Sequence, residues 1–267
     1  MSEFRTEEFT TPAPITLRVN LQAGDVEVRA EPTGTTTVEL RADSDTLLDR
    51  TRVELHGDEL IVETRDGLRG GLRKSAKLQV TVVLPEESPV TASLASADLA
   101  CHGRLGGLTA TTASGDVQAG DVTGDVSVQS ASGDVAVGHV GGAASLRSMS
   151  GDVALRGAEG DIDAHTASGD IAIGAAGGSL RARSASGDVA VGETRRGTVE
   201  VNSASGDVAV GVSAGVGVWL DVSTMSGATD TDLDVGDAAP ATGCDLRLTV
   251  RTISGDVQIT RAAARLS

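Results

Sequence analysis

The sequence predicts an all-β protein: a parallel β-solenoid (β-helix) with two-sided coils of about 18 residues and a β-rich N-terminal cap. Three observations predict it. The tripeptide Ser-Gly-Asp recurs at a fixed spacing, apolar residues alternate with polar ones between the repeats, and aromatic residues make up only 1% of the chain. A core without rings must be thin, because each buried aromatic side chain would cover about 150–250 Å².

The Ser-Gly-Asp tripeptides mark the successive coils. They begin, at intervals of 18 residues and then at longer ones, at Ser114, Ser132, Ser150, Ser168, Ser186, Ser205 and Ser254. Ser96–Asp98 is a degenerate copy upstream, and Ser226–Ala228 keeps Ser-Gly but has alanine in place of the acid. The longer spacings after Gly211 and Ala228 predict loops that bulge from one corner.

Apolar residues occupy every second position within a coil, which is the period of a strand and not of a helix. Two columns follow the Ser-Gly-Asp corner: Val117, Val135, Val153, Ile171, Val189, Val208 and Val257, then Ala119, Val137, Leu155, Ile173, Val191, Val210 and Ile259. Two more fall in the other half of the coil: Leu108, Val126, Ala144, Ile162, Leu180, Val199, Leu220 and Leu248, then Ala110, Val128, Leu146, Ala164, Ala182, Val201, Val222 and Val250. These four columns are the predicted core.

Stacking makes such coils stable, because a single coil cannot bury its own inner residues. Coils about 4.8 Å apart gain a ladder of backbone hydrogen bonds and files of like side chains. Glycines such as Gly174, Gly192 and Gly211 are expected at corners where a positive φ is cheap, and each repeat Asp is expected to accept amides of its own turn.

Two other architectures with 18-residue coils do not fit. A left-handed hexapeptide coil needs an aliphatic residue every six positions, but that register leads from Val117 to Thr123 and Gln129. A calcium-binding β-roll needs Gly-Gly-x-Gly-x-Asp repeats, and Gly141-Gly142 is followed by two alanines.

Four segments follow from these patterns: a flexible N-terminus at 1–12, a β-rich cap or irregular first coils at 13–95, a regular solenoid at 96–260 and a tail at 261–267 that covers the other end. Within the cap, alternating residues predict strands at 15–21, 26–31, 35–42, 52–65 and 78–85. A cap is expected because an open solenoid end exposes unpaired backbone.

The Ser-Gly-Asp-Val repeats, the RLGGLTATTASGDV stretch at 104–117 and the irregular β-rich N-terminal part carry a resemblance. On these motifs the chain resembles the bacterial putative-adhesin family, a β-strand-repeat domain of unknown function, over roughly residues 12–260. The resemblance implies a β-solenoid fold and no catalytic residues.

The net charge of −16 argues against nucleic acid and against anionic membranes, since both need a basic surface. Residues 1–20 have no apolar stretch typical of a secretion signal, and no window is apolar enough to insert into a membrane. We therefore expect a cytoplasmic protein. Cys101 and Cys244 have no metal-ligand spacing, and reduced, buried thiols are expected.

The repeat carboxylates are the foremost candidates for chemistry. Stacking would place them along one edge as the column Asp116, Asp134, Asp152, Asp170, Asp188 and Asp207. Calcium could bridge such a column because it takes six to eight oxygen ligands. The favoured interpretation is that each Asp caps a glycine turn, so no metal site and no cofactor is predicted.

No catalytic residue is predicted either. Carbohydrate cleavage would need a unique cleft with aromatic platforms, and the chain offers only Trp219, Phe4 and Phe9. The histidines share no ligand spacing, and His102 and His139 are expected on solvated turns.

Two further columns flank each repeat serine. Hydroxyl residues precede it by two positions, at Thr112, Ser130, Ser148, Thr166, Ser184, Ser203, Thr224 and Thr252, and are expected to satisfy corner backbone groups. Between them lie Ala113, Ala131, Met149, Ala167, Ala185, Ala204, Met225 and Ile253. This apolar column either fills the corner or faces outward beside Ala136, Ala154, Ala172, Ala190 and Ala209 as a flat face for a partner.

The expected function is a non-catalytic scaffold or protein-interaction module that binds a protein partner. The alternatives are a self-assembling structural protein and a calcium-dependent surface-binding module, of which calcium binding is not favoured.

Overall fold

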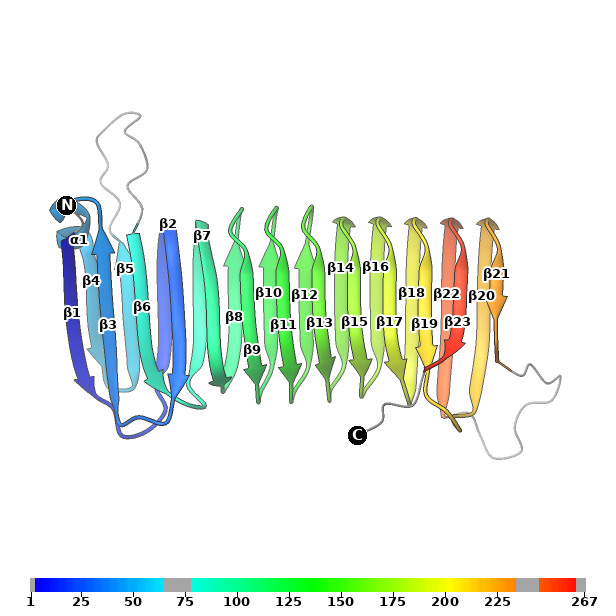
Figure 1. Cartoon of the computed structure of the whole chain (residues 1–267), viewed down its shortest axis with the longest axis horizontal. Helices are drawn as coiled ribbons and strands as arrows, with labels where there is room; N and C mark the ends of the chain where they lie inside the picture. The colour runs from blue at the N-terminus through cyan, green and yellow to red at the C-terminus, as the bar shows by residue number, and fades with distance from the viewer. Residues whose placement is uncertain (1–2, 65–77, 234–244, 263–267) are drawn as a thin grey trace. The chain divides into compact units, whose positions relative to one another are not determined.

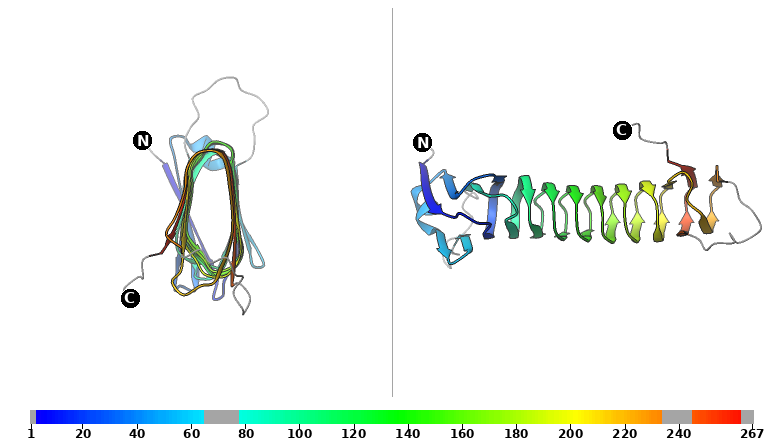
Figure 2. Two further views of the ribbon diagram at one scale, coloured as in Figure 1. Left: turned by 90° about the vertical axis from the view of Figure 1, so that its right-hand side faces the viewer. Right: turned by 90° about the horizontal axis from the view of Figure 1, so that it is seen from below.

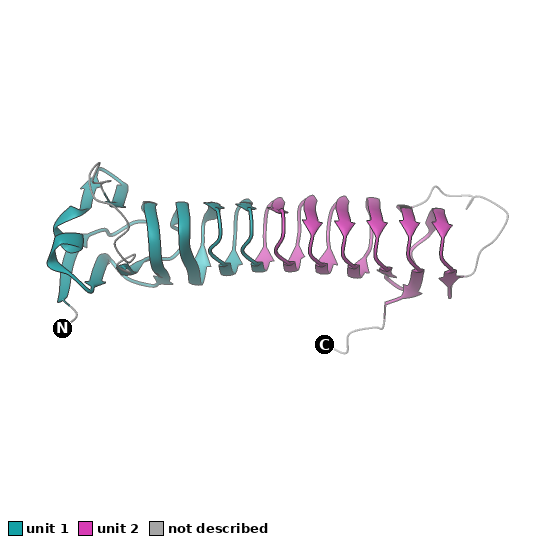
Figure 3. Cartoon of the chain, turned by 90° about the horizontal axis from the view of Figure 1, so that it is seen from above, with its two compact units in different colours: residues 1–137 teal, residues 138–267 magenta. Residues whose placement is uncertain are grey.

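The protein is described from a computed structural model, which covers residues 3–64, 78–233 and 245–262. Nearly all of these residues lie in strands, and the short helix α1 spans Asp45–Arg50. Most strands are parallel and stack as coils, so the chain is the parallel β-solenoid that the repeats predict (Figure 1). It divides into two compact units, Met1–Val137 and Gly138–Ser267 (Figure 3).

Unit 1 contains both parallel coils and an antiparallel cap. Its strands are β1 (Glu3–Thr10), β2 (Thr16–Glu31), β3 (Thr35–Ala42), β4 (Thr51–His56), β5 (Glu59–Thr64), β6 (Leu78–Pro85), β7 (Pro89–Leu105), β8 (Gly107–Thr112), β9 (Val117–Val122) and β10 (Val126–Ser130). Strand β11 (Val135–Val140) crosses the division. The strands expected between residues 15 and 85 are thus present as β2 to β6.

Parallel stacking in unit 1 begins earlier in the sequence than the repeats indicate. The long strand β2 turns a corner and pairs in parallel with β7 along most of its length, from Leu17↔Val90 to Arg29↔His102. On its other edge, β2 pairs in parallel with β5 and then with β6. Residues 16–31 are therefore a regular coil that lies between two others.

The cap consists of the antiparallel strands β1, β3 and β4, together with α1. Strand β1 pairs with β3, β3 with β6, and β4 with β5. In place of the flexible N-terminus expected over 1–12, Glu3–Thr10 form β1. Arg5 explains this order, because its guanidinium donates to the carbonyl oxygens of Leu48 and Thr51 at 3.1 and 2.9 Å, and these lie at the end of α1.

Unit 2 is built from two parallel sheets that face each other across a thin core, as the end-on view shows (Figure 2). One sheet contains β12 (Ala144–Ser148), β14 (Ile162–Ser168), β16 (Leu180–Ser186), β18 (Gly197–Ser205), β22 (Leu246–Ser254) and β20 (Val218–Ser226). The other contains β13 (Val153–Ala158), β15 (Ile171–Ala176), β17 (Val189–Thr194), β19 (Val208–Val212), β23 (Val257–Arg261) and β21 (Thr229–Thr231).

The coils of unit 2 do not stack in the order of the sequence. Strand β22 lies between β18 and β20, and β23 lies between β19 and β21. The coil at 245–261 is therefore inserted between the coils at 197–212 and 218–231. The sequence did not predict this order, in which the chain passes one coil position and returns to fill it. The loop expected after Ala228 falls largely on residues 234–244, outside the described residues.

The four predicted columns form the core. Nearly every member is buried, including Val153 at 1% exposure and Leu146 at 0%. Leu220 and Val222 are the exceptions, being half-buried. They belong to the coil at 218–231, which has a neighbour on one side only among the residues that the structure describes. Burial of these files supplies the main stabilisation.

The expected positive φ is present at four glycines that directly follow repeat serines, Gly187, Gly206, Gly227 and Gly255. Gly174, Gly192 and Gly211 do not adopt a left-handed φ, which corrects the expectation. A Cβ on Gly211 would lie 1.9 Å from the carbonyl oxygen of Gly192 in the coil below. A side chain there would separate the stacked coils.

In the described part of the chain, no helix is long and apolar enough to cross a lipid bilayer.

Candidate functional site

The column of repeat carboxylates is part of the backbone ladder. In unit 2 the amide of Asp170 donates to Oδ1 of Asp152 at 2.9 Å, and the amide of Asp188 donates to Oδ1 of Asp170 at 2.8 Å. Each Asp thus accepts an amide from the next coil, and not one from its own turn as the sequence suggested. The acceptor must be a side chain because the chain turns at this corner and leaves the amide without a carbonyl partner.

The ladder continues to the coil at 218–231 and stops there. The amide of Asp207 donates to Asp188, that of Asp256 to Asp207 and that of Ala228 to Asp256, each at 2.8 Å. Unit 1 has the same arrangement from Asp98 to Asp134. Across the described ranges, no three His, Cys, Asp or Glu side chains are grouped as a metal ion would require.

Three members of the hydroxyl column accept backbone amides at the corners, as predicted for the column, whereas Oγ of Ser203 is buried without a hydrogen-bond partner. Oγ1 of Thr112 and Oγ of Ser130 accept the amides of Gly115 and Gly133 at 2.9 and 2.8 Å. Ser148 does the same for Gly151 at 2.9 Å. These side chains are buried, so their role is structural.

The apolar column beside the hydroxyl column faces outward. Met149 is 64% exposed, Ile253 56% and Met225 82%. It does not form one flat face with the alanine column of Ala154 and Ala172, because the Ser-Gly-Asp corner separates them: the first column ends the β12 sheet, and the alanines lie on the β13 sheet. The outward orientation is confirmed, but the single face is not.

A row of basic residues runs beside this apolar column on the outward side of the β12 sheet. Strand register aligns Arg147, His165, Arg183 and Arg251 on successive strands, interrupted by the neutral Asn202 between Arg183 and Arg251. We call these residues the basic row. Each occupies the position just before the buried hydroxyl column, so the 18-residue spacing offered a sequence signal for the row that we missed.

Acidic residues on the same outward surface, two positions before the basic row along their strands, neutralise part of its charge. Arg147 pairs with Asp163 at 2.8 Å, and Arg251 approaches Asp221 at 3.8 Å. Hydrogen bonds from Asn202 and Arg181 lower the pKa of Glu200. The guanidinium of Arg183 is exposed on this surface.

Trp219 completes this outward surface. It lies on β20 and is 42% exposed, and the guanidinium carbon of Arg247 on β22 lies 4.7 Å from the centre of its ring. At that distance the cation is attracted to the ring face. Of the large apolar side chains that are exposed in the described ranges, Met149, Trp219, Met225 and Ile253 all border this sheet, and Phe4 of β1 is the other.

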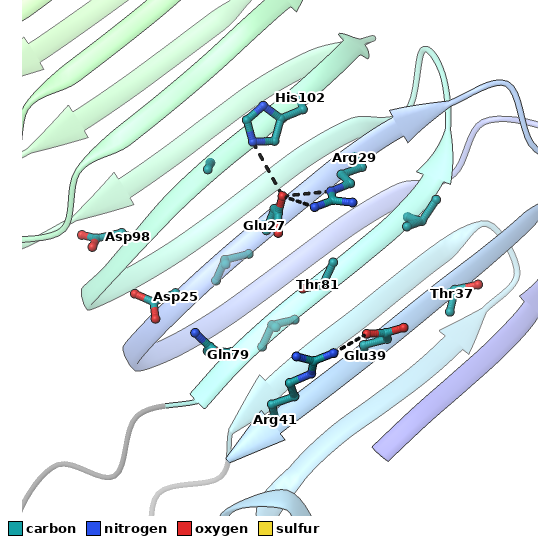
Figure 4. A pocket seen from close by; sticks show the side chains of 14 residues that line it. Asp25, Glu27, Arg29, Thr37, Glu39, Arg41, Gln79, Thr81, Asp98 and His102 are labelled. Carbon is teal, nitrogen blue, oxygen red and sulfur yellow. Dashed lines mark hydrogen bonds and ion pairs between the residues drawn. The ribbon is translucent and has the colours of Figure 1, made fainter. Parts of the chain in front are cut away.

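A shallow polar groove lies on the outward side of unit 1 across β7, β2, β6 and β3, with a volume of about 590 Å³ (Figure 4). Register places Thr81 of β6 between Glu27 of β2 and Glu39 of β3. The floor is β6, because its Thr81 and Val83 are short while both neighbouring strands carry Arg and Glu. The spacing of residues 25–102 did not predict this groove. Its strands lie side by side in the order β7, β2, β6 and β3, which is not their order in the sequence.

The charges in the groove are paired with one another. Arg29 donates from Nε to Glu27 at 2.9 Å, and Nε2 of His102 lies 3.8 Å from the same carboxylate oxygen (Figure 4). Arg41 lies 3.6 Å from Glu39. The carboxylates of Asp25 and Asp98 also line the groove, and Asp98 accepts the amide of Asp116 at 3.0 Å. His102 lies on β7 and His139 on β11, so both are on strands and not on turns.

Cys101 is free and buried, at 3% exposure. Burial raises the pKa of its thiol to about 12, so the thiol stays protonated and unreactive at neutral pH. Cys244 lies outside the described residues.

Comparison with known proteins agrees with this architecture. The model of a domain family described as Toastrack DUF4097 matches residues 15–260. A crystal structure of a putative adhesin from Bacteroides fragilis is similar at a TM-score of 0.51 and 13% identity, over 97% of each chain. No curated protein matches the chain.

Two further solved structures are more distant. One is a putative adhesin from Parabacteroides distasonis, with a TM-score of 0.43, 13% identity and coverage of 96% of this chain and 97% of that one. The other is a protein described as a putative lipid binding protein from the same species, with a TM-score of 0.42, 12% identity and coverage of 96% of each chain. The similarity to the B. fragilis structure supports the fold alone.

Proposed function

We propose that this chain, which belongs to the Toastrack DUF4097 family, is a non-catalytic scaffold that binds a protein partner through one face of unit 2. The face is the outward side of β12, β14, β16, β18, β22 and β20, and we call it the binding face. It carries the basic row and, at its margin, the exposed apolar column.

The composition of this face supports the proposal. Interfaces are enriched in Met, Trp and Arg, and Trp and Arg are also enriched at the positions that contribute most to binding energy. In a chain of net charge −16, the binding face carries Arg147, Arg181, Arg183, Arg247 and Arg251. The opposite sheet presents small residues such as Ala172 and Ala190.

The arrangement also indicates the chemistry of the partner. The residues of the basic row lie on neighbouring strands, so they are spaced about 4.8 Å apart along the stack. An acidic segment with interspersed apolar residues could place its carboxylates over the basic row and its apolar residues over Met149, Ala167 and Ala185. Such a contact would be sensitive to salt, because exposed charges are screened at high ionic strength.

Repetition supports the non-catalytic part of the proposal. A catalytic site needs singular groups held in one place, whereas the columns of unit 2 repeat one environment from coil to coil. The groove of unit 1 has a unique set of residues, and both of its arginines form ion pairs with glutamates on their own strands, Arg29 with Glu27 and Arg41 with Glu39.

The test is affinity capture of partners from the native cell by the full chain, followed by direct binding measurement. The doubly substituted variant Arg147→Ala with Arg183→Ala removes two charges from the basic row. A matched control, Ala172→Glu with Ala209→Glu, changes the net charge equally on the opposite sheet. We expect the first variant to lose at least tenfold in affinity and the control to bind as the unmodified chain does. Equal binding by both variants would contradict the proposal.

A further inference from the structure

The coil at 218–231 is an open end of the stack in unit 2. Strand β20 pairs with β22 on one edge, and β21 pairs with β23 on one edge. Within residues 3–64, 78–233 and 245–262, no strand pairs with their other edges. The nine residues of β20 contain no proline and no lysine, the residues that commonly protect a sheet edge from pairing.

At this end, no described strand packs beyond the last coil, and the core is only partly covered. Val218, Leu220 and Val222 point into the coil but are half-buried. Their neighbours in the next coil, Leu246, Leu248 and Val250, are each 0% exposed. Covering the end would remove this apolar surface from water, which is favourable in proportion to its area.

The carboxylate ladder also ends at this coil. Ala228 donates its amide to Asp256 but has no side-chain oxygen to offer to a further coil. A coil added in the same direction would leave its own corner amide without the carboxylate acceptor that the other coils provide, which is unfavourable. The end is therefore unsuited to head-to-tail extension into a filament.

From these observations we infer that two copies of the chain associate through this open end, with β20 pairing antiparallel to its own copy about a two-fold axis at Val222. A second copy presents the same flattened coil outline and the same uncovered core, so it can cover both at once. A two-fold axis reverses the direction of stacking, so no corner amide needs an acceptor from Ala228. Such a contact closes after two copies.

The register about Val222 is self-complementary. It places Leu220 opposite Thr224 of the second copy and Trp219 opposite Met225 of the second copy, which joins a thioether to an aromatic ring. Asp221 lies opposite Ser223 of the second copy, so no like charges face each other directly. The association does not depend on the basic row and is separate from the proposed partner binding.

The mass of the full chain in solution tests this inference, measured by sedimentation across the micromolar range. We expect the unmodified chain to have twice the monomer mass at tens of micromolar. Val222→Lys should be monomeric, because its ammonium reaches water at an open end but would be buried between two copies. The control Ser223→Lys adds the same charge on the outward side of the same strand and should remain dimeric.

Two cysteine variants keep the test independent of folding defects, in a chain that also carries Cys244→Ser. Val222→Cys should form a disulfide dimer under mild oxidation, since directly opposed residues of an antiparallel pair lie about 4.5–5.5 Å apart. Ser226→Cys should not, because its sulfur would lie about 27 Å from its copy.

Three results would overturn the inference. These are a monomeric unmodified chain at hundreds of micromolar, a dimer that Val222→Lys leaves intact, or absence of the Val222→Cys cross-link. The variant Arg147→Ala with Arg183→Ala should still dimerise, which distinguishes failure of this inference from failure of the proposed function.

Discussion

Replacing Gly187 by alanine should separate two stacked coils at a corner. Gly187 has φ +147°, and a Cβ built on it would lie 2.1 Å from the carbonyl oxygen of Gly169 and 2.6 Å from its carbonyl carbon. Gly215 has φ +79°, but no atom lies within 4 Å of a Cβ there. Alanine at Gly215 therefore measures the conformational cost alone, within the same unit.

The expected loss of stability follows from the contacts at the corner. The backbone conformation alone costs about 1–3 kcal/mol for a residue other than glycine. Relieving the overlap requires the coils of Gly169 and Gly187 to move apart, which breaks the bonds of the Gly169 amide to Ser186, at 3.1 Å, and of the Asp188 amide to Asp170, at 2.8 Å. Losing a hydrogen bond between neutral groups costs about 0.5–1.5 kcal/mol, and losing one to a charged group costs about 1.5–3 kcal/mol. Together with the conformational cost, we expect a total of about 3–7.5 kcal/mol for Gly187→Ala, against about 1–3 kcal/mol for Gly215→Ala.

Urea unfolding followed by circular dichroism gives both free energies of unfolding under the same conditions. Hydrogen exchange at the amides of Gly169 and Asp188 reports whether the corner itself has opened. Equal losses of stability in the two variants would refute the close-approach explanation, because they share only the unfavourable φ.

Three other predictions follow from the ladder and the buried thiol. Asp170→Ala should lower the free energy of unfolding by about 1–3 kcal/mol because the Asp188 amide loses its acceptor, whereas Asp170→Asn, which keeps an oxygen there, should lose less than half as much in the same urea assay. Cys101 should resist iodoacetamide at pH 8 in the folded chain, since burial raises the pKa of its thiol to about 12. The thiol should react once the chain is unfolded in urea. Modification of Cys101 in the folded chain within minutes, detected by peptide mass spectrometry, would contradict this prediction. Millimolar calcium should leave the melting temperature unchanged, because each ladder carboxylate already bonds a backbone amide; a rise of several degrees in calorimetry would revive the calcium alternative.

The repeated part of the fold was predictable because its periodicity is written in the sequence. The alternation around Val153 and Ile171 identifies strands, and the 18-residue spacing aligns them in the register that the structure has. The buried position of Ser148 and the outward position of Met149 also follow from that alternation.

The spatial order of the coils, and which coil forms the end of the stack, were not predictable from the periodicity. Ser205 can align with Ser226 or with Ser254, and the register is equally good in both cases, so spacing cannot decide which coil is its neighbour. The ladder offers a physical criterion: Asp256 both donates its amide and accepts one, whereas Ala228 only donates, so the coil containing Ala228 belongs at the end.

The surfaces were predictable only in part. The basic row follows the 18-residue spacing and was available to sequence reasoning. The groove of unit 1 was not, because it depends on β6 lying beside both β2 and β3, which are separated from it by long stretches of chain.

The inserted coil has a consequence for how this chain is made. During synthesis residues 218–231 leave the ribosome before residues 245–261, yet the later segment occupies the place next to 197–212. The C-terminal part therefore cannot grow by adding each new coil to the last. Either the coil at 218–231 remains undocked until the coil at 245–261 has formed, or it first docks on β18 and is then displaced by β22. We expect a chain truncated after residue 233 to take the second arrangement, with β20 directly against β18.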